Sequence, residues 1–238
     1  MGTVGVISHK NSFLRILAVE GEFMEILVTG FDPFGGSSIN PAWEAVKRLD
    51  GKVLDGQHTV HALMIPTVRY EALAAIKRGI EQFDPLLIIA VGQAGGRMAI
   101  TPERAAINCD DFRIPDNKGF QPIDEMIVPD GPAAYFSTLP IKRIVMRLTA
   151  AGIPAQVSNS AGTFVCNHVF YGLMDLLKKE GKGRRGGFIH VPYLPEQAAC
   201  LKNEPSMCLE MIVEGLTLAI KASVENGVDE RVTGGLEC

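Results

Sequence analysis

Cys166 occupies a position that is typical of a catalytic nucleophile. The segment Val157–Tyr171 indicates the end of a strand, a tight turn of small residues and then a helix that begins beside this cysteine. The helix is predicted from apolar residues at helical spacing, namely Val169, Phe170, Leu173, Leu176 and Leu177. Unpaired N–H groups and the dipole at a helix N-terminus favour a thiolate, lower a thiol pKa from about 8.5 and can stabilise an oxyanion. The alternative is a structural cysteine that packs as a small apolar residue.

A cysteine nucleophile needs an imidazole that takes up and returns its proton, and a third group that orients the imidazole. His168 lies only two residues beyond Cys166, so on a helix the two side chains point to different sides. His190 lies in the apolar strand expected over Phe188–Val191, where a histidine is often a hydrogen-bonded core residue. The remaining histidines have no sequence link to a pocket: His9, His58 and His61.

The orienting acid is less well determined by the residues alone. Glu103 follows Thr101 and Pro102, a pair that commonly starts a helix or a turn. Its ordinary role there would be to complement a helix dipole or to pair with Arg104. The other candidates in this part of the chain are Asp110, Asp111 and Asp116.

Four motifs, in order along the chain, resemble the pyroglutamyl peptidase I family of cysteine peptidases. The resemblance runs from about residue 24 to the C-terminal helix. It implies that Cys166 is the nucleophile, that His190 is the general base and acid, and that Glu103 orients His190. The motifs are Thr29–Gly36, Ile100–Asn108, the segment around Cys166, and Phe188–Tyr193.

The resemblance also implies the reaction, which is hydrolysis of the amide bond after an N-terminal pyroglutamyl residue. This ring is a neutral lactam without a free α-amine, so its pocket needs apolar walls and a few amide-type hydrogen bonds. Phe31 and Phe34 match the phenylalanines that sandwich the ring in the family. Arg113 matches an arginine near the oxyanion, although an ordinary salt bridge explains it equally well. Other pocket positions, each with an ordinary alternative as helix cap, loop residue or core residue, are Asn40, Gln93, Ile114, Phe164 and Val165.

The composition of the chain limits the classes of partner that we expect the protein to bind. The net charge of −4 over 238 residues disfavours nucleic acid and anionic membranes as partners. The five cysteines form neither CxxC pairs nor an even disulfide framework, which is typical of free thiols in a reducing compartment. The chain also lacks an apolar run of about 18 residues. We therefore expect a cytoplasmic protein that acts on a small molecule or a peptide.

We predict neither a metal nor a cofactor. The glycine-rich segment Gly92–Arg97 lacks the GxGxxG spacing of a dinucleotide loop, and no P-loop Lys-Ser/Thr follows it. The sequence also contains no HExxH motif and no cluster of Cys and His at metal-binding spacing.

Strands alternate with helices along the chain. The continuous apolar run Leu86–Val91 predicts a central strand covered on both faces. Asn40 and Pro41 indicate the cap and the first residue of a helix. We predict an α/β/α three-layer sandwich around a central mixed, mostly parallel twisted sheet. Further strands are expected over Ile26–Thr29, His58–Ile65, Ala155–Asn159 and Phe188–Val191, and further helices over Tyr70–Phe83, Pro140–Ala151 and Cys208–Ile220.

Residues 1–23 read as an N-terminal extension, either a leader segment or residues read from an upstream start codon. Residues 24–238 are expected to form a single catalytic domain, and the family resemblance implies a homotetramer. Two other functions stay open. One is the same thiol chemistry on another N-blocked or cyclic amide. The other is a non-catalytic binding or redox-sensing protein in which Cys166 is merely a reactive thiol.

Overall fold

The computed structural model describes residues 24–225 and 227–235. Its centre is a sheet with the strand order β2-β3-β1-β4-β8-β5-β6, in which β7 pairs with β5. The pairs joining β3, β1, β4 and β8 are parallel, whereas β2, β5 and β6 each form an antiparallel pair. The strands are β1 Met24–Phe31, β2 Val53–Leu54, β3 His58–Ile65, β4 Leu87–Gln93, β5 Thr101–Ile107, β6 Ala134–Phe136, β7 Ser158–Ser160 and β8 Arg185–Val191.

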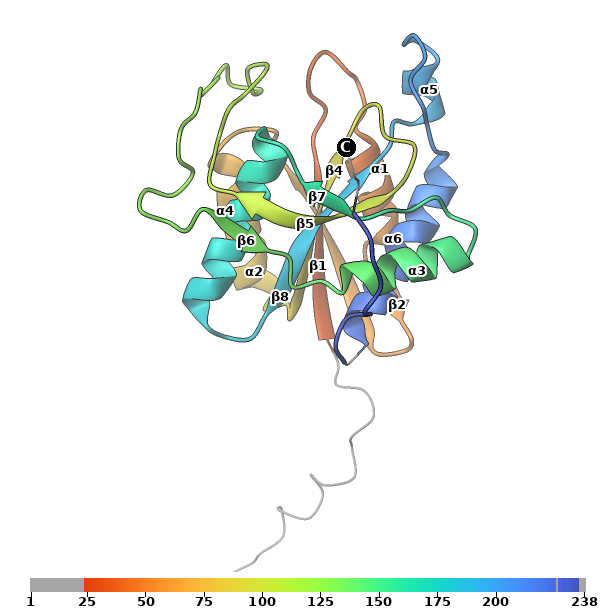
Figure 1. Cartoon of the computed structure of the whole chain (residues 1–238). Coiled ribbons are helices and arrows are strands. Elements are labelled where there is room, and N and C mark those ends of the chain that lie inside the picture. Colours follow the sequence, from red (N-terminus) through yellow and green to blue (C-terminus); the bar gives the residue numbers. More distant parts are fainter. Residues whose placement is uncertain (1–23, 226, 236–238) are drawn as a thin grey trace, which may run out of the picture.

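Helices cover both faces of this sheet (Figure 1). On one face α2 and α4 enclose one apolar cluster, and on the other α1, α3 and α6 enclose a second. The predicted three-layer sandwich with a mixed, mostly parallel sheet is confirmed. The helices are α1 Pro41–Val46, η1 Lys47–Leu49, α2 Glu71–Phe83, α3 Ile141–Ala150, α4 Val165–Glu180, α5 Pro195–Ala198 and α6 Leu209–Val224.

The central strand β4 lies between β1 and β8, and all of its residues except Gln93 are buried. This confirms the strand predicted from the continuous apolar run. Because β1, β4 and β8 are parallel, their carboxyl ends meet at one edge of the sheet, where open α/β sheets bind ligands.

Two helix starts also follow the sequence pattern. The side chain of Asn40 caps α1 by accepting a hydrogen bond from the N–H of Ala42 at 3.0 Å, and Pro41 is the first helical residue. Helix α4 begins at Val165, so Cys166 occupies its second position. The helix beginning beside the cysteine is thereby confirmed.

The start of a helix or turn at Thr101 and Pro102 is a wrong prediction. These residues begin strand β5, in which Thr101 pairs with His190 and Pro102 pairs with Ile189. Pairing with β8 overrides the local signal, and it carries Glu103 into the interior as a fully buried residue. The strand expected over Ala155–Asn159 is displaced to β7, and the short edge strands β2 and β6 were not predicted.

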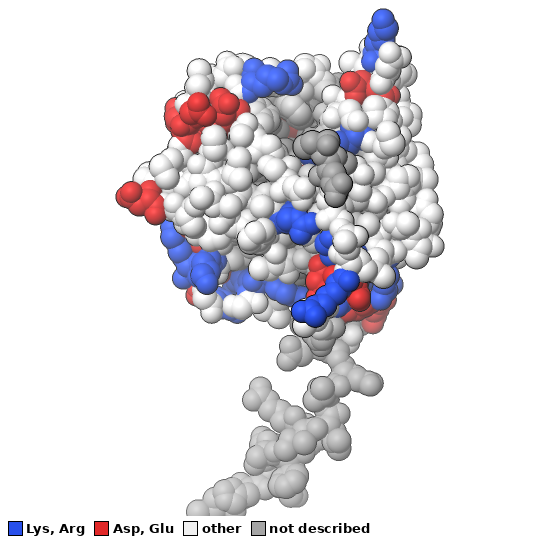
Figure 2. Space-filling model, viewed as in Figure 1, with Lys and Arg blue, Asp and Glu red and all other residues white. Residues whose placement is uncertain are grey.

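The interpretation of residues 1–23 lies outside the described residues, so the division of the chain into extension and single domain stays a prediction. None of the helices in residues 24–225 and 227–235 combines the length and apolar character needed to cross a membrane. Figure 2 shows basic and acidic side chains interspersed on one face of the molecule, with uncharged surface between them.

Candidate active site

Cys166 and His190 meet at the carboxyl edge of the sheet. Strands β4 and β8 lie side by side with Gly92 opposite His190. A Cβ atom placed on Gly92 would lie 2.9 Å from the Sγ of Cys166, so the thiol rests directly above this glycine. Both side chains line one cavity of about 380 Å³. Sheet pairing thus places the predicted nucleophile and the predicted base around the same small space.

Glu103 lies within hydrogen-bond distance of the imidazole of His190. Its Oε1 lies 2.7 Å from Nδ1 of His190, and the two residues are 0 % and 4 % exposed. A carboxylate only accepts hydrogen bonds, so Nδ1 must carry the proton and donate it to Glu103. Nε2 of the neutral ring is then left as the acceptor, which is the state that a general base requires.

Arg97 also lies at this site, although the sequence pattern did not indicate it. Its Nη1 lies 2.6 Å from Oε1 of Glu103 and 2.6 Å from Oγ1 of Thr101, and its side chain lines the Cys166 cavity. From its glycines alone, the segment Gly92–Arg97 invited comparison only with a nucleotide-binding loop. A cation in the turn that follows a central strand was the available signal, because such turns bind ligands in open α/β sheets.

The Glu103 carboxylate is charged in this site. Burial raises its pKa, but the hydrogen bond from His190, the charge that His190 carries when protonated and the charge of Arg97 outweigh that effect. The net result is a pKa below the ordinary value of a glutamate.

The pKa of the Cys166 thiol is shifted in the direction opposite to the one predicted from the sequence. Burial and the Glu103 charge raise the pKa of Cys166 to about 12, although Arg97 and a backbone hydrogen bond of Cys166 act in the opposite direction. The predicted lowering of this pKa by the helix N-terminus is therefore wrong for the free site. The helix end cannot compensate for loss of water and a nearby carboxylate. A raised pKa favours the protonated thiol, which needs a base before it can act as a nucleophile.

His168 has a different environment, as the helical spacing predicted. It is fully buried, its Nδ1 lies 2.8 Å from Oδ2 of Asp110, and its Nε2 accepts the backbone N–H of Tyr70 at 3.2 Å. Oδ2 of Asp110 is therefore shared between His168 and the guanidinium of Arg69, whose Nε lies 2.8 Å away. The carboxylate of Asp116 accepts the backbone N–H groups of Arg69, Lys118 and Phe120. Neither aspartate competes with Glu103 for His190.

The Cys166 cavity has aromatic walls. Phe31, Phe34 and Phe164 line it, and the rings of Phe34 and Phe164 have centroids 6.0 Å apart. Asn40 and Gln93 add amide groups to the lining. Asn40 also serves as the helix cap that was its alternative role, and its Nδ2 donates to the carbonyl of Asp32 at 2.9 Å. Gln93 accepts a hydrogen bond from Gln197 at 2.9 Å.

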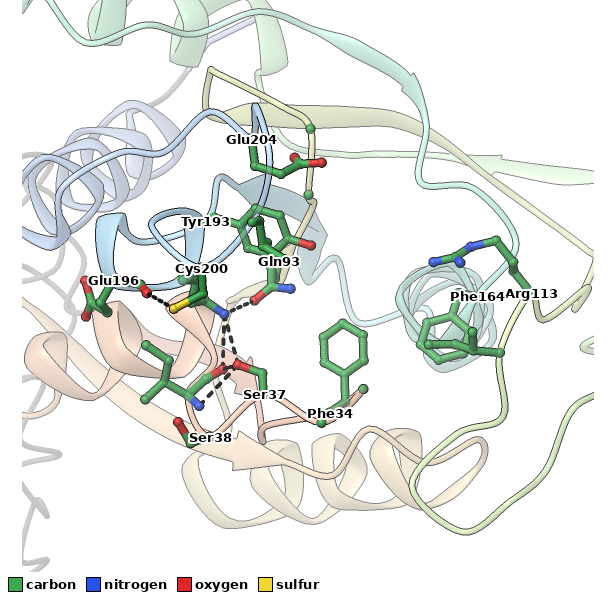
Figure 3. A pocket seen from close by; sticks show the side chains of 18 residues that line it. Phe34, Ser37, Ser38, Gln93, Arg113, Phe164, Tyr193, Glu196, Cys200 and Glu204 are labelled. Carbon is green, nitrogen blue, oxygen red and sulfur yellow. Dashed lines mark hydrogen bonds between the residues drawn. The ribbon is translucent and has the colours of Figure 1, made fainter.

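Three of the predicted site residues do not line the Cys166 cavity. Arg113 and Ile114 line an adjoining cavity, where Arg113 lies beside Phe164 and across the space from Gln93 (Figure 3). Neither of them is among the residues that line the Cys166 cavity. Val165 is fully buried in the core and lines neither cavity. Its position supports the start of α4 rather than direct contact with a ligand.

Within residues 24–225 and 227–235, no group of three or more His, Cys, Asp or Glu side chains is arranged to hold a metal ion. The cavity offers a thiol, an imidazole held by a carboxylate, a guanidinium and amide groups. This set is suited to nucleophilic attack on a carbonyl group with proton transfer.

Comparisons with known proteins agree with this chemistry. Residues 24–226 match the family model described as pyroglutamyl peptidase. The chain is 58 % identical to the pyrrolidone-carboxylate peptidase of Vibrio campbellii over 214 residues, which is 90 % of this chain and 99 % of the relative. The crystal structure of pyroglutamyl peptidase I from Bacillus amyloliquefaciens superposes with a TM-score of 0.86 at 50 % identity, covering 89 % of this chain and all of the other. The pyrrolidone carboxyl peptidase of Thermococcus litoralis gives a TM-score of 0.84 at 41 % identity, covering 88 % and 99 %.

Proposed function

The chain belongs to the pyroglutamyl peptidase family, and on that premise we propose that Cys166, His190 and Glu103 are its catalytic triad. A member of this family is a cysteine-type peptidase that removes an N-terminal pyroglutamyl residue through a Cys-His-Glu triad. The observation that carries the residue assignment is the 2.7 Å contact between His190 and Glu103, in a cavity that His190 shares with Cys166.

In the first half of the reaction, Nε2 of His190 takes the proton of Cys166 as Sγ attacks the pyroglutamyl carbonyl carbon. The tetrahedral intermediate collapses, the C–N bond breaks, and His190 gives its proton to the leaving amine. Pyroglutamyl remains attached to Sγ as a thioester. Glu103 stabilises the imidazolium formed between these two proton transfers.

In the second half, His190 takes a proton from a water molecule that attacks the thioester carbonyl. The C–S bond breaks, the thiolate regains a proton from His190, and pyroglutamate leaves as the free acid. The raised pKa of Cys166 suits this sequence, because a protonated thiol makes His190 indispensable as a base.

For the oxyanion, we propose the backbone N–H of Cys166 in the first turn of α4, where N–H groups have no partner within the helix. Arg113 is our proposed second donor, reaching inward past Phe164 from the adjoining cavity. Arg97 is the competing guanidinium, because it lies in the Cys166 cavity itself.

The pyroglutamyl ring is proposed to lie between the aromatic walls of the Cys166 cavity. Phe31, Phe34 and Phe164 offer apolar faces, while Gln93 and Asn40 supply the amide groups that a lactam can pair with. Ile114 is proposed to extend the apolar wall outward from Phe164. A cavity of about 380 Å³ has room for this ring.

We also propose, from the family resemblance, that the chain assembles as a homotetramer. The free cysteines support a reducing, cytoplasmic location as a further proposal. Light scattering on the full chain tests the assembly, because a monomeric mass at working concentration would contradict it.

The function is tested by release of a fluorescent amine from pyroglutamyl, prolyl and glutaminyl amides under reducing conditions. Selective turnover of the pyroglutamyl compound, lost in Cys166→Ala, is the expected result. Turnover of the prolyl analogue instead would retain the thiol mechanism and reject the lactam pocket. A folded protein that cleaves none of the three would point to the binding or redox-sensing alternative.

A further inference from the structure

A second and larger cavity adjoins the Cys166 cavity. Its volume is about 1010 Å³, and it shares Phe34, Gln93, Gly95 and Phe164 with the inner cavity. In the proposed reaction the ring fills the inner cavity and the scissile bond lies at Cys166. The peptide that follows the bond must then extend across the shared wall. The outer cavity is therefore the place where the residue after pyroglutamate lies.

The charges in the outer cavity are separated in space. Three of its lining residues are charged, namely Glu196, Glu204 and Arg113. Figure 3 shows Glu204 near Tyr193 and Gln93, with Arg113 on the opposite side of the space. One wall is therefore negative and the facing wall is positive.

Glu204 lacks a donor for one of its oxygens. Its Oε2 is buried and has no hydrogen-bond partner among residues 24–225 and 227–235. A buried carboxylate oxygen without a donor is costly, because it has lost water and gained nothing in return. An arriving cation or N–H group would remove that cost.

This oxygen lies beside the Gly95–Gly96 turn at the wall of the outer cavity. Oε2 of Glu204 lies 3.8 Å from the position that a Cβ on Gly96 would occupy. Gly96 follows Gly95, which lines both cavities. Glu196 differs, because it is an exposed residue and its charge is hydrated.

We propose that Glu204 binds the cationic side chain of a residue that directly follows pyroglutamate, so that pyroglutamyl-lysine and pyroglutamyl-arginine peptides are preferred substrates. Arg113 on the facing wall repels such a cation and directs it toward Glu204. The outer cavity is large enough for an extended basic side chain. This inference rests on the proposed function, since it locates the peptide by the position of Cys166.

The test compares kcat/KM for three pyroglutamyl dipeptide amides that carry lysine, norleucine or glutamate at the second position. Amidation removes the α-carboxylate, so the second side chain is the only group whose charge varies. The wild type should prefer lysine to norleucine by about threefold to tenfold, and norleucine to glutamate, at low salt. High salt should reduce both ratios, because the pairing is partly exposed to solvent.

Three variants locate the effect. Glu204→Gln should abolish the lysine-to-norleucine preference, and Glu204→Lys should invert the order so that glutamate is favoured over lysine. Glu196→Gln is the matched control with the same change in net charge, and it should keep the preference for lysine. Equal losses in the Glu204 and Glu196 variants would overturn the proposal, because they would indicate a general field rather than a site.

The outcomes also separate this inference from the proposed function. Efficient hydrolysis of all three dipeptides at equal rates by the wild type would reject the role of Glu204 and leave the peptidase activity intact. Failure to hydrolyse any of them, norleucine included, would reject the proposed function itself.

Discussion

Nη1 of Arg97 lies 2.6 Å from Oε1 of Glu103, the same carboxylate oxygen that contacts the imidazole of His190. The buried acid of the proposed triad is therefore held between an imidazole and a permanent cation. The charge of Arg97 acts on both ends of the site, because it lowers the pKa of Glu103 and opposes the rise in the pKa of Cys166. We infer that Arg97 is a positioning residue that keeps Glu103 ionised and aimed at His190.

Replacement of Arg97 by glutamine should shift the pH profile of kcat/KM to higher pH. Without the cation, the pKa of Glu103 and the pKa of Cys166 both move upward. We expect activity at neutral pH to fall about tenfold, a part of the 10²–10⁴-fold that general acid–base catalysis supplies. Arg113→Gln is the comparison. Because this variant lacks the proposed oxyanion donor, its kcat should fall, while its pH profile of kcat/KM should not shift. An unshifted profile in Arg97→Gln would refute the electrostatic role of Arg97.

Alkylation of the free enzyme by iodoacetamide should report the raised pKa of Cys166. Because burial and the Glu103 charge raise this pKa to about 12, the thiol is protonated at neutral pH and its alkylation should accelerate steadily into the alkaline range. The measurement is the rate of inactivation against pH, with the modified cysteine identified by mass spectrometry. A rate that levels off near or below pH 7 would show instead a thiolate already formed in the free enzyme.

Gly92→Ala should displace the nucleophile. The added Cβ would lie 2.9 Å from Sγ of Cys166 and 2.8 Å from the ring of Phe188. We expect a loss of kcat and a fall of about 1–3 kcal/mol in the free energy of unfolding from overpacking. Gly215→Ala is the matched control, since its Cβ would collide with Ile100 in the apolar cluster on the face of the sheet opposite α4. That variant should lose stability and keep turnover, and an equally active Gly92→Ala enzyme would contradict the geometry.

Mutations of the two buried histidines, His168 and His190, should have different effects, one on stability and the other on activity. His168→Ala removes one of the two partners of the fully buried Asp110, the other being Arg69, and leaves the Tyr70 N–H without its acceptor. The free energy of unfolding should therefore fall by about 1–3 kcal/mol. His190→Ala should instead abolish turnover. Urea unfolding and the pyroglutamyl amide assay measure the two effects. A stable His168→Ala protein without activity would assign His168 to the chemistry and contradict our account.

Acid should destabilise the protein partly through Glu103. Its folded-state pKa lies below the ordinary value, so its contribution to stability is present above the unfolded-state pKa and is lost as pH falls through the folded-state pKa. The Glu103→Gln variant lacks this titration. Its free energy of unfolding should therefore depend less steeply on pH below about 5 than that of the wild type. Parallel pH dependences in the two proteins would show that Glu103 is not ionised in the fold.

Local sequence patterns were sufficient to predict most of the helices and strands that form the scaffold. The strand His58–Ile65 has its predicted bounds, and Asn40 caps α1 as its side-chain chemistry indicated. The start of α4 beside Cys166 also follows from the spacing of apolar residues. These features depend on neighbouring residues, so the sequence pattern contains them.

The pairing of strands that lie far apart in the sequence could not be predicted from local patterns. Glu103 enters the site because β5 runs antiparallel to β8 with Thr101 opposite His190, 89 positions further along the chain. Pro102 obscured that strand, since proline commonly marks a turn. The residues alone left four acids open, and only the family resemblance selected Glu103. Arg97 was missed because its role depends on a carboxylate that the local sequence does not show.

The central claim is that Cys166 forms a thioester with the pyroglutamyl group, and acid quenching during turnover tests it most directly. Enzyme mixed with a pyroglutamyl amide, quenched and digested, should show a pyroglutamyl adduct on the peptide that carries Cys166. The adduct should be absent from Cys166→Ala and from enzyme mixed with the prolyl amide. Turnover retained by Cys166→Ala, or an adduct on Cys200 in place of Cys166, would contradict the account.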